Sequence, residues 1–219
     1  MEISTSILSV KEEESVHTFY RLETAHTDYY HIDVMDGKFV ETNTINKMQK
    51  YADELKNITN IPTEVHLMVK DVRKYADMFL ACSPRIIYFH IEAFENENDI
   101  LEMIQYIKNE NCMVGLAINP ETEIEKIYKF LPKIHNVLVM SVHPGKGGQD
   151  FIESSIDKIS TLKKYIDENK LDNLIEVDGG VNIENAKTIK EAGADYVVCG
   201  SYIINSKDYR YTINKFKEI

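Results

Sequence analysis

Short apolar segments alternate with longer amphipathic segments along the whole chain. The short segments have the length and pattern of strands, and the longer ones repeat apolar residues at helical spacing. We predict strands at residues 3–8, 29–35, 64–68, 85–91, 113–118, 136–140, 174–177 and 196–199. We predict helices at residues 11–22, 46–55, 71–81, 99–108, 151–168, 183–192 and 211–216, with one more that starts at Asn119 and Pro120.

This alternation indicates a fold class. Strand and helix follow each other eight times at a spacing of roughly 25 residues, which predicts an α/β protein with a closed parallel (β/α)8 TIM barrel. An open doubly wound sheet is the alternative. Such a sheet usually has fewer strands and a glycine-rich turn after the first strand, whereas residues 6–9 read Ser-Ile-Leu-Ser. No linker interrupts the chain, so we expect a single catalytic domain over residues 1–219.

Two helix starts carry local signals. Asp71 stands in the capping position of the predicted helix at 71–81, where a carboxylate accepts a hydrogen bond from a free backbone N–H. Three glutamates, Glu12 to Glu14, lie near the start of the helix at 11–22, where the helix dipole favours negative charge. Both features support the predicted boundaries.

Composition and charge narrow the classes of partner. Hydrophobic residues make up 43% of the chain and charged residues 28%, which is typical of a packed soluble core. The formal net charge is −11, so the chain as a whole repels nucleic acid and anionic membranes. An anionic substrate must therefore be held by local groups. We expect a small-molecule ligand, with neither nucleic acid nor membrane as a partner.

The cysteines and the N-terminus indicate a cellular compartment. Cys82, Cys112 and Cys199 are odd in number, widely spaced and free of a CxxC pair, so we expect reduced and mostly buried thiols. Residues 1–4 lead directly into a strand pattern without a signal peptide, and no run of about 18 apolar residues is present to span a bilayer. We expect a cytoplasmic protein.

The predicted strand at 29–35 carries the first chemical signal. Its side chains alternate between two faces, with Ile32 and Val34 on one and His31, Asp33 and Met35 on the other. Burial of a polar pair such as His31 and Asp33 costs free energy, so the presence of this pair at the end of a strand indicates a functional role.

Two later strands end in the same way, with His66 and with Asp178. A single buried histidine is more often a hydrogen-bonded core group, but three strand ends that repeat the pattern favour a site. In a (β/α)8 barrel the C-terminal strand ends meet at the active site, so the four side chains are expected to converge. Two imidazoles and two carboxylates suit one divalent cation of the zinc or iron type, with manganese or cobalt as alternatives. The two carboxylates also suit general acid–base chemistry.

Glycines follow three neighbouring strands. Residues 141–149 contain three glycines in four positions, which lets the backbone direct N–H groups at an anion. Barrels commonly bind phosphate between the loops after their last strands. A single glycine would indicate a turn and nothing more, whereas the set predicts a phosphate site. Its members are Gly145, Gly147, Gly148, Gly179, Gly180 and Gly200, with Ser201 beside the last.

Three methionines, Met35, Met68 and Met140, stand at strand ends near the same edge. Thioethers often fill irregular gaps in a core, and the residues by themselves favour that interpretation slightly. Alternatively, the three thioethers form an apolar layer that keeps water away from a carbanion formed in the reaction.

Five motifs in this order resemble those of the ribulose-phosphate 3-epimerase family. They are Ser-Ile-Leu-Ser at 6–9, His-Ile-Asp-Val-Met-Asp-Gly-Lys-Phe-Val at 31–40, Val-His-Leu-Met at 65–68, Met-Ser-Val-His-Pro-Gly-Lys-Gly-Gly-Gln at 140–149 and Glu-Val-Asp-Gly-Gly-Val at 176–181. The second and fifth are specific, and the resemblance extends over residues 3 to about 203.

The resemblance implies roles for individual residues. His31, Asp33, His66 and Asp178 match the metal ligands, with Asp33 as proton acceptor and Asp178 as proton donor, which exchange roles in the reverse direction. Met35, Met68 and Met140 match methionines packed around the reacting carbons. The substrate contacts implied are Ser6, His66, Gly145, Lys146, Gly147, Gly148, Gly179, Gly180, Gly200 and Ser201.

The implied reaction is the 3-epimerisation of ribulose 5-phosphate to xylulose 5-phosphate. Removal of the weakly acidic C3 proton leaves an enediolate, which a divalent metal stabilises, and a second acid returns a proton to the opposite face. No organic cofactor is required. Barrels of this type often associate, so we expect a homo-oligomer.

The chain departs from the family pattern around the substrate. Lys146 stands where the family usually has Phe, His143 where it has Asn, Glu or Asp, and Thr5 where it has Pro. Residues 41–44 lack the commoner Pro-Asn. Lys146 either pairs with the substrate phosphate or lies in solvent.

These departures leave the chemistry unchanged but leave the substrate open, with a ketohexose 6-phosphate such as allulose 6-phosphate as the alternative. Outside the epimerases, a non-catalytic sugar-phosphate binding protein is a further alternative. A lyase or decarboxylase such as hexulose-phosphate synthase is disfavoured, because the strand end at 33–36 lacks that family's Asp-x-Lys-x-x-Asp lysine.

Overall fold

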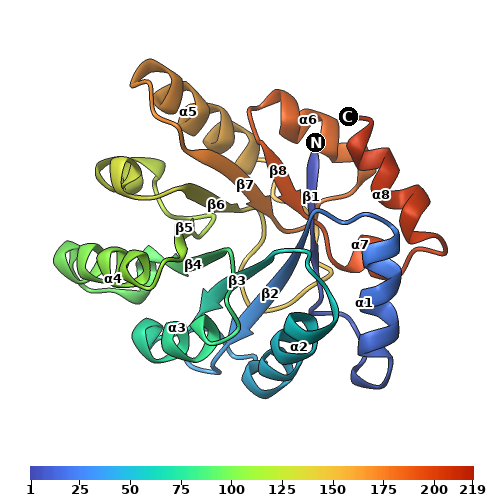
Figure 1. Ribbon diagram of the computed structural model, residues 1–219. Helices are drawn as coiled ribbons and strands as arrows, with labels where there is room; N and C mark the ends of the chain where they lie inside the picture. Colours follow the sequence, from blue (N-terminus) through green and yellow to red (C-terminus); the bar gives the residue numbers. More distant parts are fainter.

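The computed structural model describes all 219 residues as a closed barrel of eight parallel strands inside a ring of helices (Figure 1). The strands pair in chain order, and the last pairs with the first. They are β1 (Glu2–Ser6), β2 (Tyr29–Met35), β3 (Thr63–Met68), β4 (Ile86–His90), β5 (Met113–Ile118), β6 (Asn136–Met140), β7 (Leu174–Asp178) and β8 (Tyr196–Val198). The predicted TIM barrel and all eight predicted strands are confirmed.

The outer ring contains eight α-helices and three 3-10 helices. The α-helices are α1 (Ser15–Thr24), α2 (Ile45–Ile58), α3 (Val72–Leu80), α4 (Glu97–Asn109), α5 (Ser155–Glu168), α6 (Ile183–Glu191), α7 (Ser201–Ile204) and α8 (Tyr209–Lys217). The 3-10 helices are η1 (Glu12–Glu14), η2 (Ile91–Ala93) and η3 (Ile124–Lys133). No helix has the length and apolar character needed to cross a membrane.

Successive side chains along each strand point alternately to the helices outside the barrel and to the barrel interior. On β2, Tyr30, Ile32 and Val34 belong to the main apolar core between the strands and the helices. The intervening residues, including His31 and Asp33, are buried inside the barrel. This is the two-residue period expected of a strand, and it carries the polar groups inward. A smaller apolar cluster, which includes Tyr88, Leu138 and Val198, fills another part of the interior.

One predicted helix start is confirmed by the structure, and two others differ from it. The Asp71 carboxylate accepts a hydrogen bond of 3.1 Å from the backbone N–H of Lys74, so the predicted cap of α3 is confirmed. The three glutamates at 12–14 form the separate helix η1, so the prediction of one helix over 11–22 is wrong at its start. The predicted start at residue 151 is also wrong, because Ile152 N–H donates to Ser141 O at 2.8 Å and holds this segment against the end of β6.

The connection after β5 differs most from the prediction. It forms no helix at Asn119 and Pro120, and η3 begins only at Ile124. The ammonium group of Lys158 on α5 donates to the carbonyls of Asn119, Pro120 and Thr122 at 3.0, 2.6 and 2.8 Å, which fixes this stretch in a turn. The short helix α7 was not predicted.

All three thiols are free. Cys112 and Cys199 are buried and Cys82 is partly exposed, which confirms that most are buried. Burial raises the pKa of Cys199 to about 12 and that of Cys112 to about 11.

Candidate active site

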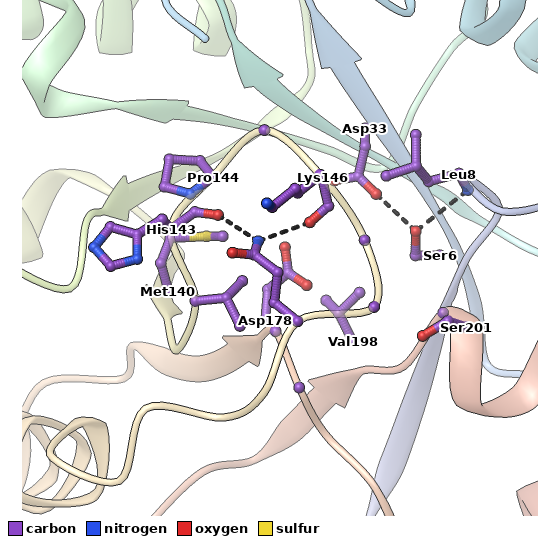
Figure 2. A pocket seen from close by; sticks show the side chains of 18 of the residues that line it. Ser6, Leu8, Asp33, Met140, His143, Pro144, Lys146, Asp178, Val198 and Ser201 are labelled. Carbon is purple, nitrogen blue, oxygen red and sulfur yellow. Dashed lines mark hydrogen bonds between the residues drawn. The ribbon is translucent and has the colours of Figure 1, made fainter. Parts of the chain in front are cut away.

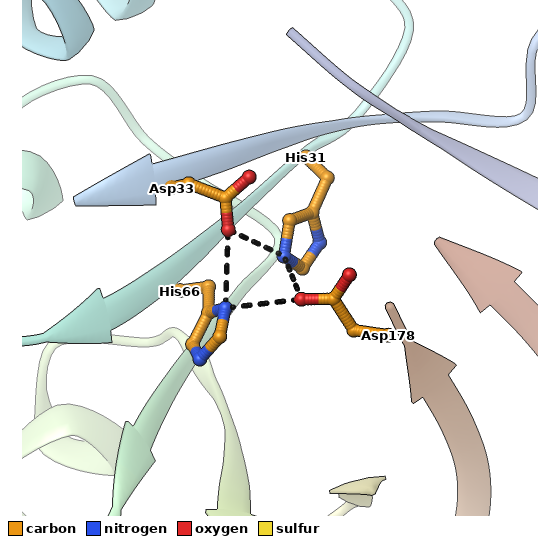
Figure 3. A group of neighbouring side chains, drawn as sticks. All are labelled: His31, Asp33, His66 and Asp178. Carbon is orange, nitrogen blue, oxygen red and sulfur yellow. Dashed lines mark hydrogen bonds and ion pairs between the residues drawn. The ribbon is translucent and has the colours of Figure 1, made fainter. Parts of the chain in front are cut away.

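Four side chains meet at the C-terminal ends of three strands, as expected from the sequence (Figure 3). His31 and Asp33 lie on β2, His66 on β3 and Asp178 at the end of β7. Nδ1 of His66 lies 3.2 Å from Oδ1 of Asp33 and 3.5 Å from Oδ2 of Asp178. Nε2 of His31 lies 3.5 and 3.9 Å from the same two oxygens. One ligand atom from each residue therefore lies within 4.8 Å of the other three.

The cluster combines burial with compensating charge. The His31 and His66 side chains are fully buried, whereas that of Asp178 is 16% exposed toward the barrel mouth. Burial alone would lower the pKa of His31, but the Asp33 carboxylate outweighs it and holds that pKa well above its usual value. Burial alone would raise the pKa of Asp33, and the two neighbouring imidazoles reverse that shift and lower it. Asp33 is therefore a carboxylate at neutral pH.

These residues fit a divalent cation. Both ring nitrogens of His31 are buried without a hydrogen-bond partner, and its Nε2 faces the two carboxylates. An unpartnered buried polar atom is costly, and a cation within the cluster would give Nε2 a partner. Two imidazole nitrogens and two carboxylate oxygens form a donor set of the kind that zinc and iron accept.

Ser6, at the end of β1, orients one of the carboxylates. Its hydroxyl donates a hydrogen bond of 2.7 Å to Oδ2 of Asp33, and it accepts one of 3.3 Å from the backbone N–H of Leu8. The predicted substrate contact thus lies beside the predicted proton acceptor (Figure 2).

A cavity opens above the cluster at the barrel mouth. Asp33 and Asp178 lie in its wall, whereas His31 and His66 are buried below it. The three methionines are each 2% exposed and line it at the ends of β2, β3 and β6. The remaining predicted site residues also line it: Ser6, Gly145, Lys146, Gly147, Gly148, Gly179, Gly180, Gly200 and Ser201.

The loop after β6 covers one side of this cavity. The Gln149 side-chain amide donates to the carbonyls of His143 and Lys146 at 2.7 and 2.8 Å, which holds the loop in a closed turn. The imidazole of His143 pairs with Glu121 from the loop after β5. Lys146 is the only lysine or arginine that lines the cavity, and its side chain extends over the mouth (Figure 2).

Further polar groups lie behind the two histidines and were not singled out from the sequence. Nδ1 of His31 lies 3.5 Å from Glu64 and 3.8 Å from Glu176. Burial and then the neighbouring Glu64 carboxylate raise the pKa of Glu176 well above its usual value. Behind His66 lies His90 of β4. The sequence does contain a signal for the two glutamates. Glu64 and Glu176 each stand two residues before a predicted metal ligand, so each points to the same inward face of its strand.

Comparisons with known proteins identify the family of this chain. Residues 2–204 match the Ribulose-phosphate 3 epimerase family. The chain is 35% identical over 220 residues to the ribulose-phosphate 3-epimerase of Helicobacter pylori, covering 100% of this chain and 98% of that protein. It is 37% identical over 219 residues to the enzyme of the same name from Escherichia coli K12, covering 98% of this chain and 94% of that protein.

A solved structure outside this family shares the fold. The 3-hexulose-6-phosphate synthase of Salmonella typhimurium superposes with a TM-score of 0.73 at 14% identity, covering 100% of this chain and 97% of that one. At this identity the likeness shows the barrel alone. The family match over nearly the whole length and the two curated relatives show more: the chain belongs to the ribulose-phosphate 3-epimerase family and is a carbohydrate epimerase of the isomerase class.

Proposed function

We propose that this chain interconverts ribulose 5-phosphate and xylulose 5-phosphate by proton transfer at C3. The observation that carries the proposal is the placement of two carboxylates, Asp33 and Asp178, on separate strands with His66 Nδ1 between them at 3.2 and 3.5 Å. The names of the two curated relatives support the same substrate class.

Each aspartate acts on one face of the substrate. The C3 hydrogen is weakly acidic because the C2 carbonyl stabilises the carbanion as an enediolate. Asp33, whose lowered pKa keeps it ionised, accepts this proton on one side of the carbon. Asp178, from β7, donates a proton on the other side, so the configuration at C3 inverts. The two residues exchange roles in the reverse direction.

His31, Asp33, His66 and Asp178 would hold the divalent cation, of the zinc or iron type with manganese or cobalt as alternatives. When bound, it would stabilise the negative charge that develops on the C2 and C3 oxygens of the substrate. Ligand groups must be deprotonated to bind a metal, so binding would release the proton that His31 otherwise carries, because the Asp33 carboxylate holds its pKa well above the usual value.

The loops and methionines at the mouth position the rest of the sugar. The glycines after β6, β7 and β8 lie at one side of the cavity, where their backbone N–H groups are suited to a phosphate. Met35, Met68 and Met140 line the cavity near the aspartates and exclude water from the reacting carbons.

Lys146 supports a second candidate, a 3-epimerase of a ketohexose 6-phosphate. Its ammonium group is the only full positive charge of a lysine or arginine at the cavity, and it extends over the mouth. A six-carbon substrate holds its phosphate one carbon further from C3. Under this candidate Lys146 reaches the phosphate or the additional hydroxyl.

A parallel assay tests the two candidates. Ribulose 5-phosphate and allulose 6-phosphate are supplied to the purified chain as isolated, after chelation, and after return of zinc, iron(II), manganese or cobalt. The proposal expects turnover of ribulose 5-phosphate that chelation removes and one of these metals restores. Faster turnover of allulose 6-phosphate supports the second candidate. Absence of hydrogen exchange at C3 with both sugars, under every metal, contradicts an epimerase.

The proposal places this activity in a cytoplasmic homo-oligomer. Sedimentation velocity of the purified chain tests the assembly, and a monomer at micromolar concentration would contradict it. Cell fractionation tests the location.

A further inference from the structure

A row of buried polar groups runs outward from His66 and takes no part in the proton transfers described above. Nε2 of His66 lies 2.9 Å from Nε2 of His90 on β4. Nδ1 of His90 lies 3.3 Å from Oε2 of Glu92. Both histidine side chains are fully buried, and that of Glu92 is 22% exposed. The row therefore links the cluster to η2, the short helix that follows β4.

Glu92 is fixed at the far end of this row. Its Oε1 accepts a hydrogen bond of 2.8 Å from the backbone N–H of Asn119 and another from the hydroxyl of Thr122. Lys158 in turn holds the carbonyls of the same turn. Burial would raise the pKa of Glu92, but the hydrogen bonds from His90, Thr122 and Asn119 lower it to about 2. Glu92 is thus an ionised group that only accepts hydrogen bonds.

The direction of each hydrogen bond follows from the chemistry of its two atoms. Glu92 accepts, so His90 donates from Nδ1, and the Nε2 of a neutral His90 carries a lone pair. That lone pair accepts a hydrogen bond from the Nε2–H of His66, 2.9 Å away. With a cation bound, His66 then has its proton on Nε2 and its lone pair on Nδ1, the nitrogen that faces Asp33 and Asp178.

We propose that His90 and Glu92 are positioning residues, which set the tautomer and ring orientation of His66 so that its Nδ1 lone pair points at the cation site. The inference rests on the proposed metal site. A ligand histidine usually donates its second N–H to a carboxylate or carbonyl, and this partner raises the basicity of the ligand. Here the neutral imidazole of His90 lies between His66 and the Glu92 carboxylate. Glu92 therefore influences His66 only through its hydrogen bond with His90.

Four variants of the full-length chain separate this role from packing. His90→Phe keeps a buried ring but removes the acceptor for His66. His90→Gln keeps an acceptor oxygen for His66 and a donor amide for Glu92. Glu92→Gln removes the charge at the far end. Glu95→Gln is the matched control, because Glu95 is exposed in the same connection and its substitution removes the same charge.

The main measurement is zinc affinity, by competition with a chromophoric chelator. Loss of such a partner typically weakens metal binding by about 10- to 100-fold, and we expect a loss in this range for His90→Phe. We expect a smaller loss for Glu92→Gln, and affinities within about threefold of the unsubstituted chain for His90→Gln and Glu95→Gln. Thermal unfolding of the metal-free proteins identifies any general loss of folding.

Nitrogen NMR of labelled histidines gives a second readout that packing would not change. In the zinc-loaded unsubstituted chain we expect the proton of His66 on Nε2 and that of His90 on Nδ1. A proton on Nε2 of His90 would overturn the inference, because His90 could then not accept a hydrogen bond from His66, and this measurement decides even if His90→Phe fails to fold.

The results separate the positioning role of His90 and Glu92 from the existence of the metal site itself. Unchanged zinc affinity in a folded His90→Phe variant overturns the inference alone, and so does a loss in His90→Gln as large as that in His90→Phe. If the unsubstituted chain does not bind zinc, iron(II), manganese or cobalt, the metal site and this inference are both wrong.

Discussion

The hydroxyl of Ser6 donates a hydrogen bond of 2.7 Å to Oδ2 of Asp33, from the end of β1 to the neighbouring strand β2. The other oxygen of Asp33, Oδ1, faces Nδ1 of His66 at 3.2 Å and Nε2 of His31 at 3.5 Å. The two oxygens of one carboxylate therefore have different surroundings. The hydrogen bond from Ser6 holds Oδ2 and so fixes the rotation of the Asp33 carboxylate. Oδ1 is thereby directed at the two histidines.

We expect Ser6→Ala to lower kcat by about tenfold, because a hydrogen bond to a charged group typically contributes about 1.5–3 kcal/mol. The fold should be unaffected, since the change removes one oxygen atom. Steady-state kinetics with ribulose 5-phosphate measures the effect. Ser9→Ala is the control, because Ser9 also lines the cavity but forms no hydrogen bond with Asp33. Equal kcat values for the two variants would argue against an orienting role for Ser6.

Asp178→Asn should abolish inversion at C3, because the amide neither donates nor accepts a proton at neutral pH. General acid–base groups typically contribute about 10²- to 10⁴-fold, and we expect a loss in this range. Substrate binding should remain measurable by calorimetry. The metal content of the same sample must be determined, because Asp178 is also a proposed ligand. Full turnover in this variant would contradict the two-base scheme.

Strand periodicity explains how much of the site could be predicted from the sequence. His31 and Asp33 are two residues apart, so they share a face, and the closed barrel brings that face to His66 and Asp178. Their convergence needed no knowledge of side-chain packing. The same argument applies to the glycines, since the ends of β6, β7 and β8 are neighbours in a barrel.

Contacts between distant segments could not be predicted in this way. The start of α5 depends on the hydrogen bond from Ile152 to Ser141, and the turn at Asn119 depends on Lys158. The partner of His66 is also distant in sequence, because His90 reaches it only when β3 and β4 pair. Propensity and spacing within one segment carry no information about such pairs. The direction of the exposed Lys146 side chain was left open for the same reason.

Gly180→Ala should weaken phosphate binding and destabilise the fold. Gly180 has a φ of +64°, and a Cβ there would lie 2.7 Å from Cα of Phe151, a backbone atom that cannot move aside freely. We expect the inhibition constant of inorganic phosphate to rise at least tenfold, equal to a loss of about 1.4 kcal/mol. Gly37→Ala is the control, because Gly37 has a similar φ of +71° but lies outside the cavity lining, and the atom nearest to the added Cβ is 3.6 Å away. It should show only the backbone strain, about 1 kcal/mol of stability. Equal effects in both variants would contradict a role for the close approach at Gly180.

Glu92→Gln should change how the stability of the fold depends on pH. The pKa of Glu92 is lowered to about 2 in the folded chain, whereas an unfolded chain has the ordinary glutamate value of about 4.3. Above that value Glu92 is ionised in both states, and its hydrogen bonds stabilise the fold in full. As the pH falls from about 4.3 toward 2, the unfolded chain binds a proton that the folded chain does not, so this contribution is lost.

We therefore expect Glu92→Gln to lower the free energy of unfolding by about 2 kcal/mol at pH 7, with a difference that shrinks as the pH falls below 4.5. Urea unfolding between pH 7 and pH 3.5, with a chelator present, measures this difference without a contribution from bound metal. Glu95→Gln removes the same charge from an exposed position of the same connection, so its curve should follow that of the unsubstituted chain. A difference for Glu92→Gln that stays constant across this range would mean that the lost stability comes from packing and not from the ionised carboxylate.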